Sequence, residues 1–352
     1  MQKLSNMQNC SDYKITIGLP VFNVEPYIKK CIESILSQDL VGIEIIVVDD
    51  CGDDNSIKIV EDTSNSIKTI IPIRIISHDI NKGVGEARNT IIKNARGKYL
   101  YFLDPDDYIE EGAMSLLYNY AEESQAEVTY GSISVWKDGV LRPFKIYPDA
   151  SFLKDDSFAL YVYNSIYETI FTSSINILYL TSFIKDNGFT FQNLKLGEDF
   201  IFRESFIPKV KRAVLRHEVT YYYYMRPNSL MQYQYRDRID IKEVEFKLRF
   251  CMKLKETCIG LEGKTYYAGK CTLVMKSIIY DICGILKHLH QLTGSVSHNE
   301  IKKVLKHPAS IRQILCFKRH KLVNIFFYFI GIFPTKVSLS LIRALGKKKG
   351  WI

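Results

Sequence analysis

The chain of 352 residues lacks the marks of several common protein classes. Its eight cysteines lie far apart and none forms a Cys-x-x-Cys pair, so neither a disulfide scaffold nor a zinc site is expected. The opening stretch MQKLSNMQNCSDYK contains no signal peptide, which predicts a cytoplasmic protein with reduced thiols. The net charge of +8 comes without a zinc finger, helix-turn-helix or RNA-binding signature, so we expect no nucleic-acid partner.

The C-terminal region also lacks an apolar run long enough to cross a bilayer. Its most apolar stretch, residues 322–333, is shorter than the ~20 residues that a spanning helix needs. Lys336, Arg343 and the lysines at 347–349 follow it. Apolar bulk beside positive charge suits a segment that lies on an anionic membrane surface. It equally suits a helix packed on the body with a frayed basic tail, and the sequence leaves both interpretations of 319–352 open.

What the sequence does contain is a regular alternation of strand and helix patterns. Short apolar runs predict strands at 14–20, 43–50, 72–77, 99–103 and 127–132. Amphipathic stretches between them predict helices at 23–38, 57–65, 86–95 and 110–123. This alternation predicts an α/β fold with a doubly wound, mostly parallel sheet.

The pattern loosens beyond residue 132. Asp138-Gly139 predicts a hairpin within 136–141, and residues 175–188 have the pattern of a helix that ends at Gly188. An aromatic strand is expected within 218–230. The remaining patterns predict long helices at 237–256 and 265–292, then shorter ones to about residue 318. We therefore expect a C-terminal α-helical extension.

Three aspartates, Asp104, Asp106 and Asp107, are crowded into four positions directly after the predicted strand at 99–103. A turn and a helix start would favour one or two acids there, because carboxylates are stabilised at helix N-termini. A divalent cation held by one or two carboxylates and a nucleotide diphosphate accounts for the cluster more simply. The sequence does not decide whether Asp107 belongs to this site or caps a helix. The acidic pair at 110–111 is expected to begin a helix and face solvent.

Asp49 and Asp50 close another predicted strand, and in a parallel sheet they would lie at the same edge as the first cluster. Alone they would cap a loop; beside a second acidic cluster they become candidates for binding a base or ribose. The segment NKGVGEARN (81–89) fails as a dinucleotide fingerprint, since Arg88 stands where a third glycine is required. Lys82 and Arg88 remain candidates for contacts with a diphosphate.

A third acidic pair, Glu198-Asp199, follows Gly197 and precedes apolar residues, so it is expected at a helix start. Charge complementarity with the helix dipole is one explanation. A general base is the other, a role that contributes about 10²–10⁴ to a rate.

Taken in order, these motifs resemble those of family 2 glycosyltransferases, inverting enzymes of GT-A fold. The resemblance extends over about residues 14–230 and rests on five segments: IGLPVFNVEPYIKKCIESILSQ, IIVVDDCGDDNS, NKGVGEARNTIIKNARGKYLYFLDPDDYIEEGAM, LGEDFIF and YYYYMRPNSLM. Two positions depart from the family pattern. Cys51-Gly52 stands where Gly-Ser or Cys-Ser is usual, and Pro105 replaces the more usual Ser between two aspartates.

The resemblance implies a nucleotide-sugar donor, commonly a UDP-sugar, and Mn²⁺ or Mg²⁺ as cofactor. Carried over by position, it implies a nucleoside pocket lined by Pro20, Val21, Phe22, Asn23, Asp49 and Asp50. Asp106 would be the main metal ligand, and Asp104 would approach the ribose or the metal. Asp199 would be the catalytic base, with Glu198 in support.

The resemblance also implies an organisation and an activity. We expect a GT-A domain at 1–235, with a donor-binding part at 14–131 and an acceptor part at 132–235, then a helical extension at 236–318 and the tail at 319–352. The expected reaction is hexosyl or N-acetylhexosaminyl transfer with inversion to a glycan or lipid-linked glycan in cell-surface polysaccharide synthesis.

On the membrane interpretation, the tail would contact the inner face of the cell membrane; a homo-oligomer is left open. Two alternatives are a nucleotidyltransferase, for which the first loop LPVFNVEP lacks the expected glycines and basic residue, and a non-catalytic scaffold that binds nucleotide-sugar.

Overall fold

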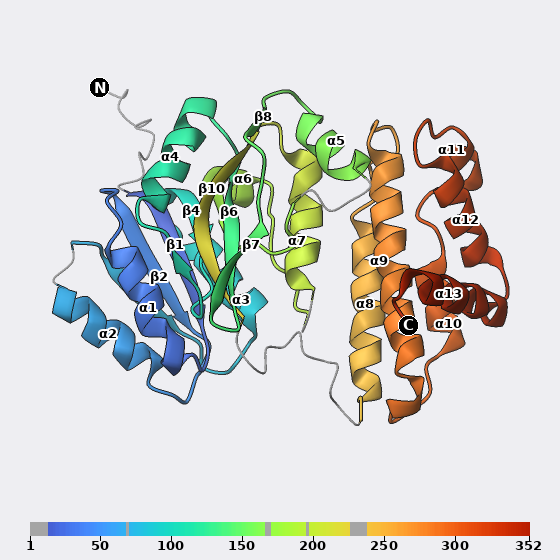
Figure 1. The fold of residues 1–352 in the computed structure, drawn as a ribbon, viewed down its shortest axis with the longest axis horizontal. Helices are drawn as coiled ribbons and strands as arrows, with labels where there is room; N and C mark the ends of the chain where they lie inside the picture. Colours follow the sequence, from blue (N-terminus) through green and yellow to red (C-terminus); the bar gives the residue numbers. More distant parts are fainter. Residues whose placement is uncertain (1–12, 68–69, 166–169, 195–196, 226–237) are drawn as a thin grey trace, which may run out of the picture. The chain divides into compact units, whose positions relative to one another are not determined.

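The computed structural model describes residues 13–67, 70–165, 170–194, 197–225 and 238–352, which form two compact units (Figure 1). The first unit is drawn from Met1–Asp155, Ile170–Asn193 and Val210–Arg226. The second is drawn from Asp156–Thr169, Leu194–Lys209 and Pro227–Ile352. The segment that carries Glu198 and Asp199 therefore belongs to the second unit.

Strands of the first unit form one sheet. Among the described residues they are β1 (Tyr13–Val21), β2 (Ile43–Asp49), β3 (Ile73–Ser77), β4 (Gly97–Phe102), β5 (Tyr108–Ile109), β6 (Val128–Lys137), β7 (Val140–Lys145), β8 (Ala150–Phe152), β9 (Ile177–Leu180) and β10 (Ala213–Tyr224). The order is β3-β2-β1-β4-β9-β6-β10-β5, with β7 beside β6 and β8 beside β10. Neighbours from β3 to β4 are parallel, whereas β9 runs antiparallel to β4 and β6. The predicted α/β fold with a mostly parallel sheet is confirmed.

Helices accompany the sheet and make up most of the second unit. In the first unit they are α1 (Glu25–Leu36), α2 (Ser56–Ile67), α3 (Val84–Asn94), α4 (Ala113–Ser124) and α6 (Thr181–Asp186). In the second they are α5 (Ser157–Asn164), α7 (Glu198–Phe206), α8 (Ile241–Glu256), α9 (Tyr267–Lys287), α10 (His298–Leu305), α11 (Ile311–Leu315), α12 (Lys321–Ile332) and α13 (Thr335–Lys349). Figure 1 shows α8 and α9 side by side, as predicted for a C-terminal helical extension.

The central parallel strands are buried on both faces, which explains their nearly continuous apolar sequences. Ile17 of β1 lies between Ile45 of β2 and Tyr101 of β4, and none of the three side chains is exposed. Helix α3 packs closely on β1, because a Cβ at Gly18 would lie only 2.3 Å from Cγ2 of Ile91. The core therefore sits directly beneath the strand ends that carry the acidic residues.

Two predicted elements differ from the structure. Residues 175–188 were predicted to be one helix, but they form strand β9 followed by the short helix α6. Tyr179 of β9 pairs with both β4 and β6, and this tertiary pairing overrides a short apolar pattern that suits either structure. The helix predicted to begin at Glu110 begins at Ala113 instead.

The predicted hairpin and the predicted aromatic strand are both present. Asp138 and Gly139, with φ of +53° and +74°, form the tight turn of the β6–β7 hairpin. The aromatic strand is β10, whereas the part of its motif from Arg226 onward lies outside the described residues.

In the part of the chain that the structure describes, every helix is too short or too polar to cross a membrane.

Candidate active site

Both acidic segments of the first unit follow the carboxyl ends of parallel strands. The Asp50 N–H donates to the Val21 carbonyl at 2.9 Å, just beyond β1 and β2. The Leu103 N–H donates to the Gly18 carbonyl at 3.1 Å, at the end of β4. The structure thus places the segments at 49–50 and 104–107 at the edge where open α/β sheets bind ligands.

Arg88 and Asp104 form an ion pair across this edge. The Arg88 guanidinium, on α3, donates to Asp104 Oδ1 at 2.8 Å. The Arg88 side chain is only 3% exposed, whereas that of Asp104 is 26% exposed. Arg88 therefore neutralises one of the three crowded carboxylates from beneath and leaves part of Asp104 open to solvent. Asp106 is half-buried in the same turn.

Asp107 has a structural role that the sequence left open. Its buried carboxylate accepts hydrogen bonds from the Tyr221 hydroxyl at 2.5 Å and from the Tyr224 N–H at 2.7 Å. Burial and the nearby charges of Asp106 and Asp104 raise the pKa of the Asp107 carboxyl well above its usual range. Because α4 begins several residues later, Asp107 does not cap that helix. It joins the acidic turn to β10.

Glu110 was predicted to face solvent from a helix start, and this is wrong. Glu110 precedes α4, is half-buried and accepts a hydrogen bond from the Tyr222 hydroxyl. The hydroxyl of Tyr221, which precedes Tyr222 on β10, accepts a hydrogen bond from the Asp104 N–H at 3.3 Å. The sequence showed a run of tyrosines but gave no sign that Tyr221 and Tyr222 would hold the acidic turn.

Asp50 organises the loop that leads into α3. Its carboxylate accepts from the N–H groups of Lys82 at 2.9 Å and Gly83 at 2.7 Å, and it lies 2.6 Å from His78 Nδ1. Only 2% of Asp50 is exposed. Asp49 accepts from the Gly52 N–H at 3.1 Å. His78, which the sequence motifs did not single out, is thus a partner of a predicted site residue.

The end of β1 presents one large apolar side chain to solvent. Pro20 and Val21 are buried, whereas Phe22 is 45% exposed. Asn23 accepts from the Asp53 N–H at 3.0 Å, which ties this end to the loop after β2. The first unit thus gathers the predicted donor-binding and metal-binding residues at one sheet edge: Pro20, Val21, Phe22, Asn23, Asp49, Asp50, Lys82, Arg88, Asp104 and Asp106.

Glu198 and Asp199 open helix α7 in the second unit, as predicted for a helix start. Glu198 is buried and Asp199 is half-buried. Gly197 precedes them with φ of +85°, and the ring of Phe200 stacks on that of Phe250 from α8 at 5.9 Å. The acidic pair is therefore positioned by a tight turn and by packing on α8.

A buried ionic cluster holds the other end of α7. The Glu204 carboxylate accepts from the Arg203 guanidinium at 2.6 Å and from Lys270 Nζ of α9 at 2.5 Å, while the Tyr163 hydroxyl of α5 donates to it at 3.0 Å. Burial alone raises the pKa of Glu204, but the charges of Lys270 and Arg203 outweigh it and hold that pKa below its usual value. The cluster joins α7 to α9 and α5 inside the second unit.

Gly197→Ala is expected to destabilise the second unit more than Gly260→Ala. Both glycines have positive φ, so each substitution costs about 1 kcal/mol in backbone strain. A Cβ at Gly197 would also lie 2.6 Å from the Phe250 ring, whereas none lies within 4 Å at Gly260. Overpacking adds about 1–3 kcal/mol. Urea unfolding of both variants measures the difference, and equal losses would contradict this packing.

Lys270→Met is expected to lower the free energy of unfolding by about 3–5 kcal/mol, because it leaves the Glu204 charge short of a buried partner. Glu204→Gln/Lys270→Met should lose less than the sum of its single variants. Since the folded pKa of Glu204 is lowered, its contribution is complete above about pH 5 and falls as the pH drops through the lower folded pKa. Denaturant unfolding from neutral to acid pH should show a flatter pH dependence for Glu204→Gln.

The acidic turn fits one kind of metal site. Among the described residues there is no group of three or more His, Cys, Asp and Glu side chains arranged to hold a metal ion. Mg²⁺ is commonly bound by one or two carboxylates together with substrate phosphates and water, not by a complete protein cage. Asp104 and Asp106, both partly open to solvent, supply carboxylate oxygens of that kind.

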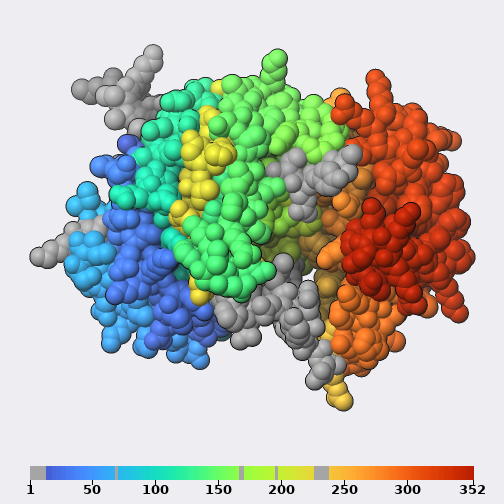
Figure 2. All heavy atoms as spheres, viewed as in Figure 1, coloured from blue at the N-terminus to red at the C-terminus, as the bar shows by residue number. Residues whose placement is uncertain are grey.

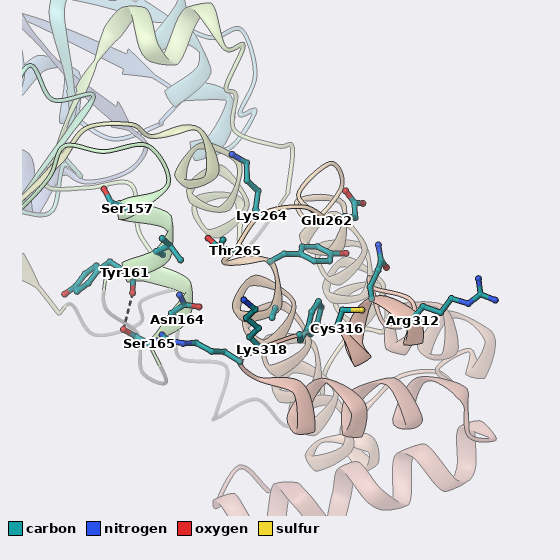
Figure 3. Close-up of a pocket in the computed structure, with 16 residues that line it drawn as sticks. Ser157, Tyr161, Asn164, Ser165, Glu262, Lys264, Thr265, Arg312, Cys316 and Lys318 are labelled. Carbon is teal, nitrogen blue, oxygen red and sulfur yellow. Dashed lines mark hydrogen bonds between the residues drawn. The ribbon is translucent and has the colours of Figure 1, made fainter.

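The second unit also contains a cavity of about 1120 Å³ (Figure 3). Its walls come from α5, the loop at 262–265 with the start of α9, and α11. Its charged residues are Glu262, Lys264, Arg312, Lys318 and Arg319. None of the predicted donor, metal or catalytic residues lines this cavity, so the cavity and the candidate site share no residues.

The first unit thus has a mostly parallel sheet with acidic turns beyond its carboxyl edge. The model of glycosyl transferase family 2 matches residues 16–185. The chain is also 31% identical over 252 residues to the uncharacterized glycosyltransferase EpsJ of Bacillus subtilis, covering 67% of this chain and 69% of EpsJ. The chain belongs to glycosyl transferase family 2 and is a glycosyltransferase.

Other relatives carry more specific names. The poly(ribitol-phosphate) beta-glucosyltransferase of Bacillus spizizenii is 31% identical over 218 residues, which are 60% of this chain and 32% of that protein. The poly(ribitol-phosphate) beta-N-acetylglucosaminyltransferase TarS of Staphylococcus aureus is 29% identical over 237 residues, 66% of this chain and 39% of TarS. The chain thus matches only about a third of the length of these two relatives.

A solved structure shares the fold. The crystal structure of Staphylococcus aureus TarS 1–349 in complex with UDP-GlcNAc superposes with a TM-score of 0.67 over 96% of this chain and 92% of that one. At 18% sequence identity, this similarity shows the GT-A fold.

Proposed function

We propose that the protein transfers a sugar, with inversion, from a UDP-sugar to a hydroxyl of a glycan or lipid-linked glycan in cell-surface polysaccharide synthesis. The observation that carries the proposal is the pair Asp104 and Asp106 at the carboxyl edge of a family 2 sheet. The names of the relatives, which act on poly(ribitol-phosphate), support a cell-surface polymer as acceptor. The UDP-GlcNAc complex of TarS supports a UDP-sugar as donor.

The donor would lie along the edge of the first unit. Phe22, the exposed side chain after β1, is proposed to contact the base, with Pro20, Val21, Asn23, Asp49 and Asp50 shaping the pocket around it. Asp50 does so by holding the loop before α3 in place. Lys82, exposed on that loop, is proposed to approach the diphosphate.

Asp106, with Asp104, is proposed to hold Mn²⁺ or Mg²⁺, whose charge would offset the negative charge that develops on the leaving diphosphate. Arg88 keeps Asp104 in place through their ion pair. It also reduces the repulsion among the three aspartates of the turn. Arg88 would therefore act on the donor through Asp104.

Asp199 is proposed to take the proton from the acceptor hydroxyl, with Glu198 beside it in support. The acceptor oxygen forms its bond to the anomeric carbon on the face opposite the nucleotide. The bond from that carbon to the diphosphate oxygen breaks, and the nucleoside diphosphate leaves with the electron pair. The assignment of 132–235 to acceptor binding, which the Glu-Asp motif motivates, is part of the same proposal.

The test is a panel of nucleotide-sugars incubated with the purified protein, Mn²⁺ and glycan acceptors. Release of nucleoside diphosphate from one donor and sugar incorporation into an acceptor are expected. Asp186→Asn, an exposed acid outside the candidate site, serves as the matched control for carboxylate variants. Turnover of none of the donors would instead favour a non-catalytic scaffold. Family membership already argues against the alternative of a nucleotidyltransferase.

A further inference from the structure

The C-terminal part of the second unit has an extreme charge pattern. From Ile301 to Ile352 the sequence contains twelve lysine and arginine residues and no aspartate or glutamate. The region includes most of α10 and all of α11, α12 and α13, and these residues are all described by the structure. A folded region with charge of only one sign attracts surfaces of the opposite sign.

Helix α12 has two faces with different surroundings. Its inner face, which includes Asn324, Phe327, Ile330 and Gly331, is buried. Its outer row consists of Leu322, Phe326, Phe329 and Phe333, spaced at helical intervals so that they lie on one side. These side chains are 82%, 40%, 42% and 38% exposed. A row of exposed aromatic and aliphatic groups marks an interaction surface.

The outer row is exposed on a firmly packed helix. Asn324 donates to Thr272 Oγ1 of α9 at 2.8 Å, and His307 Nε2 lies 2.9 Å from Asn324 Oδ1. A Cβ at Gly331 would lie 2.5 Å from the Leu305 carbonyl, so α12 packs tightly on α10. The two interpretations of this segment from sequence are therefore compatible, because one face packs on the unit while the other remains open.

The following helix, α13, extends both properties. Val337 and Leu341 are exposed at successive turns, and the lysines at 347–349 are exposed in the last turn. Trp351 packs edge-on against Tyr280 of α9, so this basic end is held on the unit. Figure 2 shows α13, in dark red, at the surface of the second unit.

We propose that the outer row of α12, together with the basic residues of α13, docks the protein on an anionic lipid bilayer. Apolar side chains would enter the interfacial layer while lysines contact anionic headgroups. A soluble polyanion would use the cations but leave the aromatic row in water. A second copy placed on the same face would meet like charges, with no acid in residues 301–352 to pair them. The inference does not depend on the donor chemistry proposed above.

The test is co-sedimentation of the full chain with phosphatidylcholine vesicles, with and without about one-third phosphatidylglycerol. Binding to the anionic vesicles only is expected, and it should weaken in ~1 M salt, where the screening length is about 3 Å. Phe326→Ser/Phe329→Ser should lower the partition coefficient by about tenfold or more. Lys347→Gln/Lys348→Gln/Lys349→Gln should lower it on anionic vesicles.

The matched control is Val41→Ser/Ile259→Ser, which removes apolar groups that are 71% and 74% exposed outside the C-terminal helices. It should sediment like the wild type. Thermal unfolding checks that each variant is folded. Vesicle binding that Phe326→Ser/Phe329→Ser leaves unchanged would overturn the proposal. Light scattering provides a second check. The proposal would also be overturned if the wild type were a dimer and Phe326→Ser/Phe329→Ser converted it to a monomer that still bound vesicles.

Discussion

Replacing Asp199 by asparagine is expected to lower kcat by about 10²–10⁴ while the affinity for the nucleotide-sugar donor stays unchanged. Asparagine keeps the size of the side chain at the start of α7 but cannot accept the proton of the acceptor hydroxyl. Steady-state kinetics with a donor that the wild type turns over give kcat, and calorimetric titration gives donor affinity.

Two further variants sharpen this result. Asp186→Asn makes the same chemical change at an exposed position and should leave kcat unaltered. Glu198→Gln should reduce kcat less than Asp199→Asn, since Glu198 is buried and assigned a supporting role. Wild-type kcat in Asp199→Asn would remove Asp199 from the mechanism and require another base.

Asp106→Asn is expected to have the second large effect, a fall in kcat of about 10³ at fixed Mn²⁺. Neutralisation of developing charge by a bound cation is worth several kcal/mol, and each 1.36 kcal/mol corresponds to tenfold in rate. The Mn²⁺ concentration that gives half-maximal activity should also rise, because one carboxylate ligand is lost. A metal titration of activity measures both quantities.

Glu111→Gln is the control for this titration, since Glu111 is exposed just beyond the same turn. Its metal titration should match that of the wild type. If Asp106→Asn kept the wild-type metal dependence, the acidic turn would not be the metal site. Activity of the wild type that persists fully in a chelator would contradict metal dependence itself.

Much of the first unit could be predicted from sequence because its central strands are buried on both faces. Such strands, for example β1 and β2, have continuous apolar sequences bounded by helices. Few other structures fit this pattern. β9 was missed because a strand of a few residues carries too little periodicity, and its pairing with β4 and β6 comes from distant parts of the chain. The start of α4 was misplaced because Glu110 suits a helix N-terminus but is bound by β10 instead.

The candidate site was predictable in its acids and not in their partners. Aspartates that follow strand ends can be recognised in the sequence. The topology of a parallel sheet then gathers them at one edge. The ion pair of Arg88 with Asp104, the bond from Tyr221 to Asp107 and the contact of His78 with Asp50 join residues from different elements. Local pattern carries no information on such pairs. These pairs also explain how three crowded aspartates are tolerated in one turn.

The C-terminal helices show a different limit. From sequence alone, residues 319–352 could either pack on the body of the protein or lie on a membrane surface. Composition does not say which side of a helix meets the body. The structure separates the inner and outer faces of α12 through partners such as Thr272 and His307. A defined row of side chains on α12, rather than the whole segment, is therefore proposed to meet the membrane.

Direct transfer from a nucleotide-sugar by single displacement inverts the configuration of the anomeric carbon. NMR of the sugar transferred from an α-linked UDP-sugar measures the anomeric configuration of the product. A β-linked product is expected, because the acceptor oxygen attacks from the face opposite the diphosphate. An α-linked product would contradict single displacement and the role assigned to Asp199.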